Sequence, residues 1–255
     1  MKFSANLGFL WTEKALPDAI RAAHAAGFDA VECHWPYEVP VAEVVAALKD
    51  TGLPMLGLNT RRGDVGAGDV GLSALPGRAS DARAAIDEAI AYATAVGAGN
   101  VHVMAGMASG AAARDAFVSA LDHACTRAAP EGITILIEPL NPHDAPGYFL
   151  STTGQAVEII AQVGALNLKL MFDCYHVART EGDVIGRLKS VWGSIGHIQF
   201  AAVPDRGPPD QGTLDYSQVF RAIARMGYQA PLGAEYKPGP DTGASLGWMP
   251  KLAPE

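Results

Sequence analysis

Four polar residues each stand at the end of an apolar, strand-like run of this 255-residue chain. They are Glu138 after residues 133–137, Asp173 after 168–172, Gln199 after 195–198 and Glu235 after 231–234. Successive members are 35, 26 and 36 residues apart, close to the length of one strand and one helix each time. If the four runs are neighbouring parallel strands, their ends meet at one edge of the sheet and the four side chains converge there.

A site of this composition predicts a bound metal ion. Three carboxylates at one point repel each other unless a hard divalent cation lies among them, and such cations take oxygen ligands. Taken alone, an acidic residue at a strand end is more often a helix N-cap. Four polar residues at consecutive strand ends favour the metal, although the Gln199 amide could instead bridge hydrogen bonds. The predicted metal ligands are Glu138, Asp173, Gln199 and Glu235.

Strand-like and helix-like segments alternate along the chain. Besides the four runs above, strands are expected at about 3–7, 28–33, 53–58 and 101–104. Helices are expected at about 16–26, 41–50, 79–96, 111–128, 153–163, 183–192 and 216–226. No Ser/Gly linker or charge run divides the chain, so we predict one catalytic domain over residues 1–255. Eight alternating units predict an α/β fold, a single (β/α)8 TIM barrel with its active site at the carboxyl ends of the strands.

An open, doubly wound sheet would alternate in the same way. The sequence has no Gly-rich phosphate-binding motif of the form GxGxxG or GxxxxGK[ST] after any expected strand, which favours the barrel. Residues 59–77 are longer than an ordinary connection, and we expect them to cover the active site.

Charge and cysteine content exclude several classes of protein. The formal net charge of −8 argues against a nucleic-acid or membrane-surface partner, because proteins that bind these present basic surface. Three cysteines without a CxxC spacing predict neither a disulfide framework nor a zinc ribbon, and they indicate a reducing compartment, the cytoplasm. Residues 89–113 carry no charge, but a helix followed by a buried strand explains their Ala- and Gly-rich composition better than a membrane span.

Three further residues near the expected strand ends are suited to bind a substrate. His176 lies three residues after Asp173 in an expected loop, where it could hydrogen-bond a substrate oxygen. Arg206 follows the seventh strand, and a lone arginine in a site lined by carboxylates suits an anionic or polar group. Lys237 follows Glu235 by two residues and is a second candidate cation. For both cations the alternative is an ordinary solvated charge.

One reaction suits this set of residues particularly well. A divalent ion bound by the carbonyl and adjacent hydroxyl oxygens of a small hydroxy-oxo compound acidifies the neighbouring C–H. A carboxylate can then remove that proton, and a carboxylate can return one to the adjacent carbon of the enediolate. Glu138 and Glu235, after the expected fifth and eighth strands, are the predicted catalytic pair. The sequence therefore predicts a metal-dependent aldose–ketose isomerase.

Four motifs surround these positions: Glu138-Pro139-Leu140-Asn141, Phe172-Asp173-Cys174-Tyr175-His176, Gly196-His197-Ile198-Gln199 and Glu235-Tyr236-Lys237-Pro238. Together they resemble the hydroxypyruvate isomerase family, which belongs to the xylose isomerase-like TIM barrels. The likeness extends from residues 3–7 through 75–78 to the last strand, essentially the whole chain.

The resemblance implies an isomerase that interconverts hydroxypyruvate and tartronate semialdehyde, or a relative acting on 2-oxo-tetronates or ketoses. It implies Mg²⁺ or Mn²⁺ as the cofactor, held by the four ligands named above, with Glu138 and Glu235 as the acid–base pair. His176 and Arg206 match positions that hold substrate oxygens in related ketose epimerases. Members of the family often form dimers or tetramers, so a homodimer or homotetramer is expected.

Two loops depart from the family's common pattern and leave the substrate open. Asn141-Pro142-His143-Asp144 stands where relatives read Asn-His-Phe-Asp. Arg61 and Arg62, after the third strand, could contact an anionic substrate or coat the surface. A ketose 3-epimerase would use the same metal and glutamates to exchange a proton at one carbon. A nuclease resembling endonuclease IV is a further alternative, but the acidic net charge and the single evident set of ligands argue against it.

Overall fold

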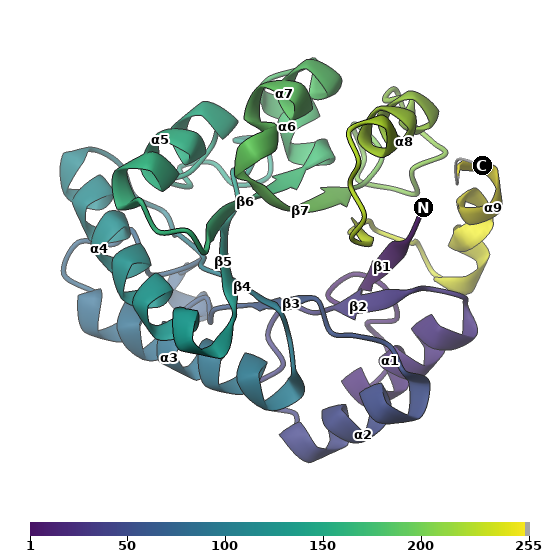
Figure 1. Cartoon of the computed structure of the whole chain (residues 1–255), viewed down its shortest axis with the longest axis horizontal. Coiled ribbons are helices and arrows are strands. Elements are labelled where there is room, and N and C mark those ends of the chain that lie inside the picture. Colours follow the sequence, from purple (N-terminus) through teal and green to yellow (C-terminus); the bar gives the residue numbers. More distant parts are fainter. Residues whose placement is uncertain (253–255) are drawn as a thin grey trace.

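Short runs of buried apolar residues form eight parallel strands in the computed structural model, which describes residues 1–252 (Figure 1). The strands are β1 Phe3–Asn6, β2 Ala30–Glu32, β3 Gly57–Asn59, β4 Asn100–His102, β5 Thr134–Ile137, β6 Leu168–Asp173, β7 Ile195–Phe200 and β8 Leu232–Ala234. They lie in the order β2-β1-β8-β7-β6-β5-β4-β3. A parallel bridge between Val31 and Met55 joins the two ends of this sheet and closes the barrel.

Amphipathic helices surround the strands, as Figure 1 shows. They are α1 Leu16–Ala25, α2 Val41–Thr51, α3 Ala79–Val96, α4 Ala111–Ala128, α5 Thr153–Val163, α6 Cys174–Thr180, α7 Val184–Val191, α8 Tyr216–Arg225 and α9 Met249–Leu252. Short 3-10 helices occupy Val65–Ala67, Ala129–Glu131, Trp192–Ser194 and Gly243–Trp248. Within residues 1–252, no helix combines the length and the apolar character that crossing a membrane requires.

The predicted (β/α)8 barrel is therefore confirmed, with local differences. The helices expected at 79–96, 111–128 and 153–163 end where they were predicted to end. The third strand is displaced: it was expected at 53–58, but it lies at Gly57–Asn59, and Met55 contributes an isolated bridge. The sequence also missed helix α6, which begins directly after β6.

The last segment of the chain takes the place of an eighth long helix. After β8 the chain forms the 3-10 helix Gly243–Trp248 and then α9, beside the amino terminus (Figure 1). Trp248 is fully buried, and its ring packs edge-on against Phe3 at 4.9 Å and Phe200 at 5.3 Å between centroids. Its indole N–H donates to the Tyr236 hydroxyl at 3.1 Å. This aromatic cluster ties the C-terminal segment to β1 and β7.

Replacing Trp248 with alanine is expected to destabilise the protein by about 3–5 kcal/mol, because the change leaves a large cavity beside β1 and β7. Urea unfolding followed by circular dichroism measures the loss. Leu166→Ala is the matched control, since Leu166 is 94% exposed, and it should alter stability by less than about 0.5 kcal/mol. Equal stability of the two variants would contradict the role assigned to this cluster.

Candidate active site

The four predicted ligands lie at the carboxyl ends of four consecutive strands. Asp173 ends β6 and pairs in register with Gln199 of β7, which in turn pairs with Gly233 of β8. Glu138 directly follows β5, and Glu235 directly follows β8. The sequence predicted that Gln199 follows the seventh strand, but Gln199 lies within β7. None of the four ligand candidates is more than 5% exposed, so the structure buries them all at one end of the barrel.

Three of these residues direct an unsatisfied oxygen into the site. Glu138 Oε1, Asp173 Oδ2 and Gln199 Oε1 are buried without a hydrogen-bond partner among residues 1–252. A buried polar atom without a partner is costly, and an unpaired buried charge is more so. Oxygen atoms of carboxylate and amide groups are the ligands that hard divalent cations take. These residues therefore fit a divalent metal.

The structure also brings a histidine into this cluster. Ligand atoms of Glu138, Asp173 and His176 lie within 4.8 Å of one another. However, His176 Nδ1 accepts the backbone N–H of Asn141 at 2.9 Å. Burial and the charge of Arg206 lower the pKa of His176 to about 3, so the ring is neutral and carries its hydrogen on Nε2. His176 is therefore a hydrogen-bond donor facing the carboxylates, and this suits the predicted contact with a substrate oxygen better than metal ligation.

Helix α6 places this histidine, and the prediction that His176 lies in a loop was wrong. Asp173 Oδ1 accepts the backbone N–H of Tyr175 at 2.8 Å and caps the helix. His176 lies in the first turn of this helix and is buried. Asp173 thus combines the two roles that the sequence offered as alternatives: one oxygen is an N-cap, and the other faces the site.

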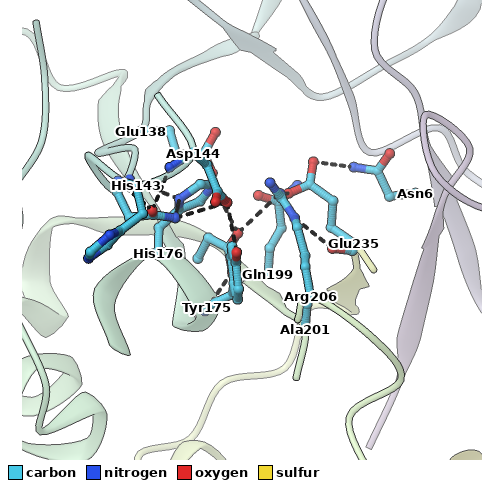
Figure 2. Close-up of polar contacts among 12 residues, drawn as sticks. Asn6, Glu138, His143, Asp144, Tyr175, His176, Gln199, Ala201, Arg206 and Glu235 are labelled. Atoms are coloured by element: carbon cyan, nitrogen blue, oxygen red, sulfur yellow. Dashed lines mark hydrogen bonds and ion pairs between the residues drawn. The ribbon is translucent and has the colours of Figure 1, made fainter. Parts of the chain in front are cut away.

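Glu235 is held by a different set of partners. Its Oε2 lies 2.5 Å from Arg206 Nη2, and its Oε1 accepts hydrogen bonds from Asn6 Nδ2 at 2.9 Å and His34 Nε2 at 3.0 Å. Figure 2 shows Arg206 beside Glu235 and Asn6 on the other side of that carboxylate. The same Arg206 nitrogen lies 3.5 Å from Asp173 Oδ2. The guanidinium therefore neutralises part of the negative charge at the rim.

These environments shift the pKa values of the two glutamates in opposite directions. Burial, together with the charges of Glu235 and Asp173, raises the pKa of Glu138 well above its usual range. Burial also raises the pKa of Asp173 to about 7, against the opposing effect of Arg206. Burial alone would raise the pKa of Glu235, but Arg206 and the hydrogen bond from His34 lower it to about 2. Two carboxyls whose pKa values are shifted in opposite directions suit the roles of one proton donor and one proton acceptor.

The predicted cations occupy distinct positions. Lys237 is exposed, and its backbone N–H donates to the Arg206 carbonyl oxygen at 2.7 Å, so its predicted contact with substrate remains a prediction. Arg61 forms ion pairs with Glu38 at 3.0 Å and Glu88 at 2.7 Å on the surface. The guanidinium of Arg62 instead stacks 3.9 Å over the centre of the Trp35 ring. Arg61 is therefore a surface residue, which was one of the two alternatives for this arginine.

Sequence reasoning missed several residues that line or support the site. Asn6 ends β1, Glu32 ends β2 and His102 ends β4, so each follows the pattern from which the four ligands were predicted. His102 Nδ1 lies 3.7 Å from Glu138 Oε2, and burial lowers the pKa of the His102 ring to about 3. Applying the rule of polar residues at strand ends to the first half of the chain would have identified all three.

Comparisons with known proteins give the family and the fold of the chain. Residues 20–252 match the family described as xylose isomerase-like TIM barrel. A 2-oxo-tetronate isomerase of Cupriavidus necator is 44% identical over 252 residues, covering 97% of both chains. A Mus musculus protein provisionally named hydroxypyruvate isomerase is 38% identical over 260 residues, covering 98% of this chain and 94% of that protein. A crystal structure from Brucella melitensis, named AP endonuclease family 2, has 33% identity and a TM-score of 0.95, covering 99% of both chains.

The affinity of the site for Mn²⁺ is expected to rise with pH. Glu138 and Asp173 have raised pKa values, so they carry protons at pH values where ordinary carboxyls are ionised, and a bound cation must displace those protons. Titration calorimetry in two buffers of different ionisation enthalpy should show tighter binding and less proton release as pH rises from about 5.5 to 8. Binding that is independent of pH and releases no protons would contradict the raised pKa values.

Proposed function

The chain belongs to the xylose isomerase-like TIM barrel family and is an isomerase, and we propose that it interconverts the aldose and ketose forms of a small hydroxy-oxo acid. The relative at 44% identity favours a 2-oxo-tetronate as the substrate, and hydroxypyruvate is the second candidate. The observation that carries the reaction type is the pair of buried glutamates with opposite pKa shifts beside three unsatisfied oxygens.

We propose Mg²⁺ or Mn²⁺ as the cofactor. The unsatisfied oxygens of Glu138, Asp173 and Gln199 would hold the ion, and Glu235 would complete the set. When bound, the ion supplies Lewis-acid polarisation of the substrate carbonyl and acidifies the adjacent C–H. The excess of carboxylates over cationic groups at the rim supports this choice.

The two glutamates would transfer the proton. Glu235 is ionised, because Arg206 and His34 lower its pKa, so it can remove a proton from the carbon beside the carbonyl. Glu138 lies across the site, and burial together with the charges of Glu235 and Asp173 raises its pKa, so this carboxyl is suited to exchange a proton with the neighbouring carbon of the enediolate. The hydroxyl hydrogen of the substrate moves to the former carbonyl oxygen, which completes the exchange of aldehyde and ketone.

Neutral and cationic donors would hold the substrate during this exchange. The Nε2–H group of His176 faces the carboxylate cluster and can donate to a substrate oxygen. Arg206 is partly buried at the same rim, between Asp173 and Glu235, and can pair with a carboxylate or hydroxyl of the substrate. Lys237 remains a further candidate at the exposed edge.

Phosphodiester cleavage is the second candidate, because the Brucella melitensis structure carries a nuclease name. Binding DNA requires basic surface that contacts phosphates. This chain has a formal net charge of −8. The charge of the molecule therefore supports the isomerase.

Proton exchange tests the reaction and the substrate together. With Mn²⁺ in deuterated water, a 2-oxo-tetronate or hydroxypyruvate should acquire deuterium at the carbon next to the carbonyl and convert to its isomer, as followed by NMR. Fructose and tagatose are the matched comparison. Label and inversion at carbon 3 of these ketoses, with no label in either acid, would identify an epimerase and overturn the proposed substrate class. Cleavage of DNA containing an abasic site, without any exchange, would identify the nuclease.

Glu138→Gln and Glu235→Gln should each lower kcat by about 10²- to 10⁴-fold, because each removes a proton-transfer group while keeping the shape of the side chain. Steady-state kinetics and circular dichroism measure activity and folding of the same samples. Glu13→Gln changes an exposed carboxylate and serves as the control with unaltered kcat. A folded Glu138→Gln protein with full activity would remove Glu138 from the reaction.

A further inference from the structure

One buried carboxylate takes no part in the proposed reaction. Glu32 ends β2, is 4% exposed and lies inside the barrel behind the predicted ligands. Its Oε1 accepts hydrogen bonds from Gln199 Nε2 at 2.7 Å and Asn6 Nδ2 at 3.1 Å. Its Oε2 lies 2.8 Å from His197 Nε2, which donates because a carboxylate has only acceptors to offer. Glu32 therefore binds three donors from β1 and β7 at once.

The contact with Gln199 decides which end of that amide faces the site. An amide presents an oxygen acceptor at one corner and an NH2 donor at the other, and the two have nearly the same shape. Because the NH2 group of Gln199 donates to Glu32, Oε1 is the atom left without a partner at the rim. The reversed amide would place two acceptors together at Glu32 and would turn N–H hydrogens toward any bound cation.

A second contact extends the influence of Glu32 to the other side of the site. The Asn6 NH2 group donates to Glu32 Oε1 and, at 2.9 Å, to Glu235 Oε1. Asn6 Oδ1 accepts the backbone N–H of Gly8 at 2.9 Å, which prevents the Asn6 amide from reversing. Asn6 therefore links Glu32 rigidly to Glu235.

The backbone leaves space for this arrangement at one position. A Cβ atom on Gly233 of β8 would lie 2.6 Å from Glu32 Oε1 and 2.8 Å from Gln199 Cγ. Both distances are too short for real contacts, so any larger residue would push Glu32 and Gln199 apart. The absence of a side chain at residue 233 admits the hydrogen bond between them.

We propose that Glu32 is a positioning residue that selects the oxygen of Gln199 as a metal ligand and, through Asn6, orients Glu235. This inference rests on the metal site of the proposed function. It also assigns a cause to the unsatisfied Gln199 oxygen. Partners outside the first set of ligands commonly control metal affinity by about 10- to 100-fold.

Mn²⁺ binding to purified protein, measured by calorimetry, tests the proposal. Glu32→Leu removes both acceptors and should weaken Mn²⁺ binding by about 10- to 100-fold. Glu32→Gln is the matched control: its amide oxygen can still accept from Gln199 and Asn6, while a change of tautomer lets His197 accept from the new NH2 group. The Gln variant should therefore lose less affinity than the Leu variant. A folded Glu32→Leu protein with native affinity, or equal losses in the two variants, would overturn the proposal.

A double-mutant cycle keeps the test valid if Glu32→Leu does not fold. Gln199→Glu alone brings a second carboxylate against Glu32, whereas in the Glu32→Gln background the new carboxylate gains an N–H donor. The factor by which Gln199→Glu changes Mn²⁺ affinity should therefore be at least about threefold more favourable in the Glu32→Gln protein than in the native protein, because the two residues are in contact. Additive effects would overturn the proposal.

NMR of the metal-free protein separates this proposal from the proposed function. The side-chain NH2 resonance of Gln199, assigned by its loss in Gln199→Glu, should be shifted downfield by its hydrogen bond to Glu32. It should stay downfield in Glu32→Gln and move upfield in Glu32→Leu. If the native protein binds neither Mn²⁺ nor Mg²⁺, the cofactor of the proposed function is wrong, and this resonance still reports on Gln199. A resonance unaffected by Glu32→Leu would overturn the positioning role.

Discussion

Buried negative charge at the carboxyl end of the barrel is the constraint on which the site depends. Glu32, Glu138, Asp173 and Glu235 are all nearly inaccessible, and the guanidinium of Arg206 contacts two of them. The repulsion that remains is large, because charges interact more strongly away from water. Burial and this repulsion together raise the pKa of Glu138. Three oxygens, from Glu138, Asp173 and Gln199, also have no hydrogen-bond partner among residues 1–252. The residues that carry these three oxygens therefore fit a divalent cation.

The distribution of hydrogen-bond donors turns this crowded site into an asymmetric one. Arg206, Asn6 and His34 all contact Glu235, which is therefore the ionised carboxylate. Glu138 has no comparable donor among residues 1–252. The histidine nitrogens nearest to its carboxylate, His102 Nδ1 at 3.7 Å and His176 Nε2 at 3.9 Å, lie beyond hydrogen-bonding distance. The chemical difference between the two glutamates thus arises from their neighbours and not from their own type. Such a difference in pKa between two carboxyls is a common basis of acid–base catalysis.

Rigid elements keep these contacts in place. Neighbouring strands fix Asp173 and Gln199 in register, and the cap at the start of α6 fixes the turn that carries His176. Around the rest of the barrel, the aromatic cluster at Trp248 secures the C-terminal segment, although that segment forms only short helices. Catalytic groups placed on strands and helix starts hold their geometry more accurately than groups on loops.

The alternation of strands and helices and the convergence of the four predicted ligands could be predicted from sequence because both depend on local patterns. Apolar runs of strand length followed by helical periods define a β/α unit, and parallel strands must end at one rim. For the same reason, helices at 79–96, 111–128 and 153–163 were predicted with correct bounds. The short α6 was missed, because a seven-residue segment after an aspartate is too short to show a helical period.

Only the tertiary structure decided how each polar group is used. Glu32 meets Gln199 across 167 residues of sequence, and Asn6 meets Glu235 across 229. Hydrogen-bond direction, amide orientation and pKa shift depend on which groups lie within about 3–4 Å and on how completely water is excluded. Neither quantity is encoded in residue type or spacing. The chain by itself therefore determined which oxygens gather at the rim, and folding decided which of them are paired, protonated or free.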